Sequence, residues 1–132
     1  MADRITLTLP PDPEYAPSVR LLLSGVASVI GFTVDQIEDI RACASEACLL
    51  LLNGQQVSRL ELDVEAGQAL KVRVVAHSVA ADQQSGFEDF SEEISRLMIE
   101  ALSDECEFVD DNGLLREVTF VKNAGNETER GM

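Results

Sequence analysis

The sequence predicts a single α+β domain, a two-layer sandwich in which about three helices cover one face of a mixed, mostly antiparallel sheet. Two observations support this fold class. Segments with alternating polar and apolar residues are separated by segments with apolar residues every three or four positions. Their order, β-α-α-β-β-α-β-β without an internal repeat, is typical of helices layered on a sheet. A length of 132 residues suits one hydrophobic core.

The chain begins with a predicted strand and helix. Residues Arg4 to Leu9 alternate with period two, and the prolines of Pro10-Pro11-Asp12-Pro13 end the strand. From Glu14 to Ile30 apolar residues recur at spacings of three and four, and Pro17 falls in the first turn, where proline is tolerated. Gly31 stands where it would end this helix.

A second helix is predicted from Val34 to the Asn53-Gly54 pair. Thr33 and Gln36 form a capping-box pattern, in which each side chain satisfies a backbone N–H at the helix start. The last turn is apolar nearly all round, which predicts burial on several sides. Glu46 is the one carboxylate next to that apolar run.

Two hairpins are predicted in the second half of the chain. Ser58 to Val64 and Leu70 to His77 alternate and are joined by a short glycine-containing connection. Glu105 to Val109 and Leu114 to Val121 are separated by an Asn-Gly pair, which favours a tight turn.

Between the hairpins a third helix is predicted after a polar loop from Ser78 to Phe87. Asp89 or Ser91 can cap this helix. Its apolar positions are Ile94, Leu97, Met98, Ala101 and Leu102. We expect the domain to occupy residues 1–122 and residues 123–132 to form a polar, frayed tail.

The composition restricts the partners. With 24 acidic and 10 basic side chains the formal charge is -14, which disfavours binding to nucleic acid and to anionic membranes. The negative charge either favours binding to a basic protein surface or serves only to keep the protein soluble. We expect a cytoplasmic protein, because no signal peptide is recognised and the longest apolar run is too short to span a bilayer. The cysteines Cys43, Cys48 and Cys106 lack a C-x-x-C pair, and with only one histidine we expect buried thiols and no metal site.

Several segments together resemble the anti-sigma-factor serine kinases of bacteria, over roughly Ile5 to Val121. The segments are Pro13-Glu14-Tyr15, Leu21-Leu22-Leu23-Ser24-Gly25-Val26-Ala27, Gly31-Phe32-Thr33, Gln36-Ile37-Glu38-Asp39-Ile40, Ser45-Glu46-Ala47-Cys48 and Ile99 to Phe108. The resemblance implies the histidine-kinase-like ATPase fold that is shared with gyrase. It also implies a homodimer that binds a sigma factor or an anti-anti-sigma antagonist.

The family's first ATP-binding element is a helix with Glu-x-x-x-Asn, in which the glutamate activates the attacking hydroxyl and the asparagine coordinates magnesium. Glu46 matches the glutamate, the general-base position. Leu50 stands in the place of the asparagine and has no oxygen to offer a hard cation. Asn53, about one turn further along, is the nearest substitute.

The second and third elements are also altered. Where the family has Asp-x-Gly-x-Gly to hold adenine, this chain has His77 and neither glycine. Where the family has a glycine-rich lid over the phosphates, this chain reads Glu93-Ile94-Ser95-Arg96-Leu97, and Arg96 is a lone cation among acidic residues. These changes predict a degenerate nucleotide site.

The favoured interpretation is therefore an anti-sigma-factor-like module that binds a protein partner and has lost ATP binding and kinase activity. No cofactor is then expected. One alternative is an active serine kinase that uses ATP and magnesium, with Glu46 as the base. Another is a small-molecule sensor that uses the former nucleotide pocket, lined by Leu50 and its neighbours, unless those leucines fill the pocket as core.

Overall fold

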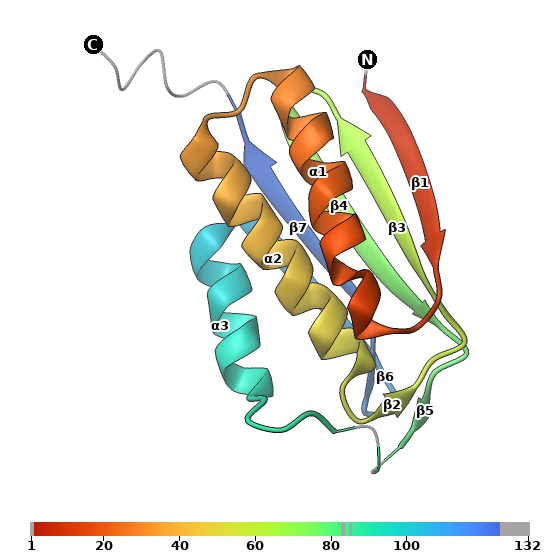
Figure 1. The fold of residues 1–132 in the computed structure, drawn as a ribbon. Helices are drawn as coiled ribbons and strands as arrows, with labels where there is room; N and C mark the ends of the chain where they lie inside the picture. Colours follow the sequence, from red (N-terminus) through yellow and green to blue (C-terminus); the bar gives the residue numbers. More distant parts are fainter. Residues whose placement is uncertain (1, 83, 85, 125–132) are drawn as a thin grey trace.

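The computed structural model describes residues 2–82, 84 and 86–124, and it forms two layers (Figure 1). One layer is a five-stranded sheet with the order β1-β3-β4-β7-β6, and the other consists of three α-helices on one face of that sheet. In chain order the elements are β1 (Asp3–Leu9), a 3₁₀ turn (Pro13–Tyr15), α1 (Ala16–Ile30), α2 (Val34–Leu52), β2 (Gln55–Gln56), β3 (Arg59–Ala66), β4 (Ala69–His77), β5 (Ala80–Ala81), α3 (Glu92–Leu102), β6 (Glu105–Asp111) and β7 (Leu114–Asn123). The predicted fold class is confirmed.

The sheet is held in register by apolar side chains that face the helices. All four strand pairs of this sheet are antiparallel. One row crosses it from edge to edge, because each residue lies opposite the next: Leu7, Leu62, Val74, Val118 and Phe108. A slip of one residue would turn such a row to the opposite face, so burial of one face fixes the register.

Helix α2 is the centre of the core. It lies between α1 and α3 and packs on the sheet (Figure 1). Ile40, Ala44, Ala47 and Leu51 are completely buried, as expected from a helix that is apolar on several sides. The small alanines let the neighbouring helices approach closely, while Leu51 fills the space above the sheet.

The start of α2 agrees with the sequence prediction, and the start of α1 differs from it. Thr33 Oγ1 accepts from Gln36 N at 3.2 Å and Gln36 Oε1 accepts from Thr33 N at 3.0 Å, which confirms the capping box. Helix α1 begins at Ala16 and not at the expected Glu14. Pro17 has no N–H to donate to the Pro13 carbonyl, which instead accepts from Ala16 in a 3₁₀ turn.

Two features of the strands differ from the sequence expectation. The small β2–β5 sheet, with Gln55 opposite Ala81 and Gln56 opposite Ala80, was not predicted. Strand β7 continues to Asn123, one residue past the expected end of the domain. The rest of the expected tail, apart from residue 124, lies outside the described residues.

The sheet face opposite the helices is polar. Two cross-strand ion pairs lie on it, Arg4 with Asp63 at 3.0 Å and Arg73 with Glu117, and His77 Nε2 is hydrogen-bonded to Glu61 at 2.8 Å. The Arg4 guanidinium donates to Asp63 and lowers the pKa of that carboxyl. This alternation of a buried and a solvated face is usual for antiparallel sheets.

The cysteines are free, as expected, and Cys43 and Cys48 are buried. Burial raises the pKa of both thiols to about 12. Within the described ranges no group of histidine, cysteine and carboxylate side chains is arranged to hold a metal ion. Among the helices that the structure describes, none combines the length and apolarity that a membrane crossing needs.

Candidate functional site

The candidate site is a pocket where α2 passes the first turns of α3. Its volume is about 350 Å³. Ser91 caps α3 by accepting from Ile94 N at 3.3 Å, which selects Ser91 over Asp89 as the capping residue. The pocket is lined by Glu46, Leu49, Phe87, Glu88, Asp89, Phe90, Ser91, Ile94 and Ser95. The wall is thus largely apolar, with carboxylates at intervals.

Glu46 points from α2 toward α3 and is paired there. Ser95 Oγ donates to Glu46 Oε1 over 2.6 Å. Ser95 is only 3% exposed, so its hydroxyl is fixed by the packing of the two helices. A hydroxyl bound to a carboxylate forms a short, charge-assisted bond. A glutamate on this largely buried helix thus has a hydrogen-bond partner from the neighbouring helix.

Leu50 lies one turn after Glu46 and belongs to the core. It is 3% exposed and joins the main hydrophobic cluster. It does not line the pocket beside Glu46, whose α2 wall is formed by Leu49 instead. The expectation that the leucines at this end of α2 pack as core is met at Leu50, while Leu49 lines the pocket.

Asn53 is occupied with holding the loop that precedes α3. Its Oδ1 accepts from the backbone N of Phe87 at 2.9 Å, and its own backbone N donates to Leu49 O to end α2. The amide oxygen that would have to replace a magnesium ligand is therefore engaged in positioning Phe87, a wall of the pocket.

His77 and Arg96 are not brought to Glu46. In β4 the residues Leu70 to Ala76 with even numbers are buried under the helices, so His77 faces the opposite side of the sheet, where it contacts Glu61. Arg96 lies over the ring of Phe108, 4.8 Å from its centroid, and pairs with Glu92 and Asp110.

Gln55 is a residue whose role sequence reasoning missed. Its side chain is buried, and its Nε2 donates to the carbonyls of Leu51 and Leu115 at 2.7 and 3.0 Å. Its Oε1 accepts from Leu115 N at 2.9 Å. The glutamine thus joins the end of α2 to the start of β7. No local pattern signals this, because Leu115 is 60 residues away.

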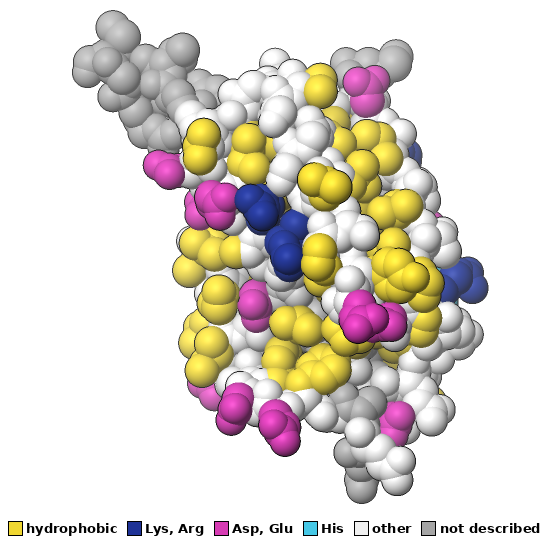
Figure 2. Space-filling model, in the orientation of Figure 1, with side chains coloured by type: hydrophobic (Ala, Val, Ile, Leu, Met, Phe, Trp, Pro, Cys, Tyr) yellow, Lys and Arg dark blue, Asp and Glu magenta, His cyan; other side chains and the backbone are white. Residues whose placement is uncertain are grey.

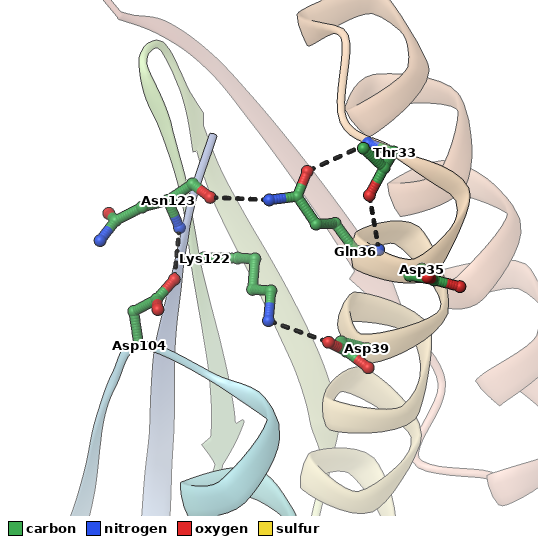
Figure 3. Close-up of a pocket in the computed structure, with 7 residues that line it drawn as sticks. All are labelled: Thr33, Asp35, Gln36, Asp39, Asp104, Lys122 and Asn123. Atoms are coloured by element: carbon green, nitrogen blue, oxygen red, sulfur yellow. Dashed lines mark hydrogen bonds and ion pairs between the residues drawn. The ribbon is translucent and has the colours of Figure 1, made fainter. Parts of the chain in front are cut away.

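A second pocket, of about 360 Å³, lies at the start of α2 (Figure 3). Lys122 Nζ donates to Asp39 at 3.0 Å and to the Leu102 carbonyl at 2.8 Å. Gln36 Nε2 donates to the backbone carbonyl of Asn123, and the backbone N–H of Asn123 donates to Asp104 Oδ2 at 2.7 Å. These hydrogen bonds tie the start of α2 to the end of α3 and to the end of β7.

The architecture is a two-layer α+β fold that is consistent with the fold of the histidine-kinase-like ATPases, and Glu46 lies on its central helix. The comparison with known proteins agrees. This chain is 53% identical over 47 residues to serine-protein kinase RsbW of Bacillus subtilis (strain 168), a segment that covers 36% of this chain and 29% of that protein. It is 54% identical over 46 residues to RsbW of Bacillus velezensis, over 35% of this chain and 29% of the relative.

RsbW of Listeria monocytogenes (serotype 4a) is 53% identical over 47 residues, covering 36% of this chain and 30% of the relative. No protein-family model matches the chain. The matched segment thus spans less than a third of each of these relatives. Over that segment the similarity confirms the resemblance to the anti-sigma-factor serine kinases.

Proposed function

We propose that this chain is a cytoplasmic regulatory protein of the anti-sigma type that binds a protein partner and has lost ATP binding and phosphoryl transfer. The observation that carries the proposal is the state of the former catalytic helix: Glu46 is bonded to Ser95 at 2.6 Å, and Leu50 is buried in the core one turn later. The carboxylate that would act as the base is hydrogen-bonded to a serine of the same chain, and a leucine stands where a magnesium ligand is needed. Both observations support the loss of phosphoryl transfer.

The loss of the metal ligand is the stronger part of this argument. Magnesium binds oxygen ligands and neutralises the triphosphate, so an alkyl group in place of an amide removes a ligand without replacement. Asn53 has its oxygen on Phe87 N, and Arg96 is turned to Asp110 and Phe108. Glu88 and Asp89, which line the pocket, and Glu92 and Glu93, which follow them in the sequence, would repel phosphates.

The partner that we propose is a sigma factor or an anti-anti-sigma antagonist, and the assembly is a homodimer. The similarity to proteins named serine-protein kinase RsbW supports this class of partner, together with the resemblance in the sequence. A formal charge of -14 suits a basic surface such as a DNA-binding region.

Calorimetric titration with Mg-ATP and with Mg-ADP tests the loss of the nucleotide site. We expect no saturable heat at nucleotide concentrations up to the millimolar range. Binding at micromolar concentration would refute the degenerate site. The partner is tested separately by capture from a lysate of the host, followed by mass spectrometry; recovery of neither a sigma factor nor an antagonist would contradict the proposed function.

An active serine kinase is the second candidate, and the name of the relatives favours it. Incubation of the chain with radiolabelled ATP and a captured antagonist separates the two: transfer of label that is lost in Glu46→Gln would establish the kinase. A sensor for a small apolar ligand is favoured only by the apolar wall of Leu49, Phe87, Phe90 and Ile94.

A further inference from the structure

Helix α3 turns an apolar stripe to solvent. Ile94 is 59% exposed, Leu97 55% and Met98 36%, and Ala101 is also exposed. Their spacing of three and four residues places them side by side along about two turns, or about 10 Å. Figure 2 shows hydrophobic side chains in a row over this helix. Such a face on a helix is ordinarily turned toward a core, so its exposure calls for a partner.

The stripe continues into the pocket beside Glu46. Ile94 belongs to both, and Leu49, Phe87 and Phe90 complete the apolar wall. The rings of Phe87 and Phe90 meet edge to face, with centroids 5.8 Å apart, and Asn53 holds the Phe87 backbone in place. The pocket is therefore preformed, and its volume of about 350 Å³ admits one large apolar side chain.

The border of the stripe is acidic and uncompensated. Glu88, Asp89, Glu93 and Glu100 are exposed or half-exposed, and none forms an ion pair with another of the described residues. The one cation of α3, Arg96, points to the other side of the helix, toward Glu92 and Asp110. Cations supplied by a partner would thus find free carboxylates beside the stripe, at Glu93 and Glu100, and at the pocket, at Glu88 and Asp89.

We propose that this surface, the stripe together with the pocket and its acidic border, docks an amphipathic helix of a protein partner. The helix carries one large apolar anchor for the pocket and lysine or arginine along the flanks of its apolar face. A second copy of this chain fits poorly, because it would place the same carboxylates opposite one another. The proposal rests on the proposed protein-binding function and names the surface and the chemistry of the partner.

A synthetic peptide of about five helical turns serves as the probe, with leucine at three- and four-residue spacing and lysine elsewhere. Its binding is followed by fluorescence anisotropy at physiological ionic strength. We expect the double variant Ile94→Ser with Leu97→Ser to bind at least tenfold more weakly, or about 1.4 kcal/mol. The matched control is Leu21→Ser with Val29→Ser on α1, two side chains that are 76% and 89% exposed; we expect unchanged binding. Urea unfolding verifies that both variants fold.

The charge is tested with a second pair of variants. Glu93→Lys on the border is expected to weaken binding several-fold more than Glu107→Lys, an exposed carboxylate on β6. A scrambled peptide of the same composition, without an apolar face, is expected to bind weakly.

Four results would overturn the proposal. Equal losses for the two charge variants, or equal binding of the scrambled peptide, would indicate attraction by net charge alone. Self-association of the native chain in sedimentation equilibrium that the Ile94→Ser, Leu97→Ser variant abolishes would assign the surface to a second copy. Undiminished capture of a sigma factor or antagonist by that variant would place the docking surface elsewhere while the proposed function stood.

Discussion

Replacing Gln55 with alanine is expected to lower the free energy of unfolding by about 3 kcal/mol. Its side chain donates hydrogen bonds to the carbonyls of Leu51 and Leu115 and accepts one from the N–H of Leu115. Each contributes about 1 kcal/mol net, and the Leu115 backbone would be left with unpaired polar groups in a buried place. The loss is large compared with the total stability of a domain of this size.

Urea unfolding followed by circular dichroism measures this loss. With a slope of about 2 kcal/mol per molar urea, the midpoint of the Gln55→Ala variant should fall by about 1.5 M. Gln56 is the matched control, because it is the exposed neighbour in the same short strand, and Gln56→Ala should change stability by less than about 0.5 kcal/mol. Equal midpoints for the two variants would refute the assigned role of Gln55.

Three further predictions follow from burial and charge. Leu50→Asn introduces the asparagine of the anti-sigma-factor serine kinases that the sequence resembles, and it should destabilise the fold by about 3–5 kcal/mol in urea unfolding, because an amide replaces a buried alkyl group. Calorimetry of this variant should still detect no Mg-ATP binding. Cys43 and Cys48, whose pKa is raised to about 12, should not react with Ellman's reagent at pH 8 until urea unfolds the chain; two fast-reacting thiols in the native state would contradict their burial. Because the pKa of Asp63 is lowered, its ion pair with Arg4 stabilises the fold above the ordinary aspartate pKa, near pH 4, and this stabilisation is lost as the pH falls through the lowered pKa. The free energy of unfolding of Arg4→Ala should therefore approach that of the native chain at low pH. A difference in stability that does not depend on pH would contradict this assignment.

The parts of the fold that were predictable are those encoded by neighbouring residues. The capping box of Thr33 and Gln36 is a pair of contacts over three residues. The Asn112-Gly113 turn follows from two residues that tolerate positive φ, here 55° and 79°. Alternation likewise located β3 and β4, because one face of each strand is buried.

The unpredictable parts depend on contacts between distant segments. The β2–β5 sheet consists of two-residue strands that a periodicity cannot reveal. The resemblance points to Glu46 as a match and to the segment around Ser95 as a departure from the family's pattern. The hydrogen bond between the two residues spans 49 residues and depends on how α3 packs on α2, so the sequence does not reveal it. His77 stands in the sequence where the family has its adenine-binding aspartate, but the side of the sheet to which it points is decided by strand alternation after Ala76.

Gln36 at the start of α2 and Gln55 in β2, just after the end of α2, are two buried glutamines that restrict movement of the helix. Gln36 donates to Asn123 at one end of β7, and Gln55 bonds to Leu115 near the other. The helix and this part of the strand are matched in length, about 28 and 27 Å. A helix fastened at both ends to one strand cannot slide along the sheet or shift by a turn without breaking buried hydrogen bonds. A partner that binds at the α3 surface would therefore meet a stiff platform beneath it, and any movement on binding would have to occur in α3 and in the loop that precedes it.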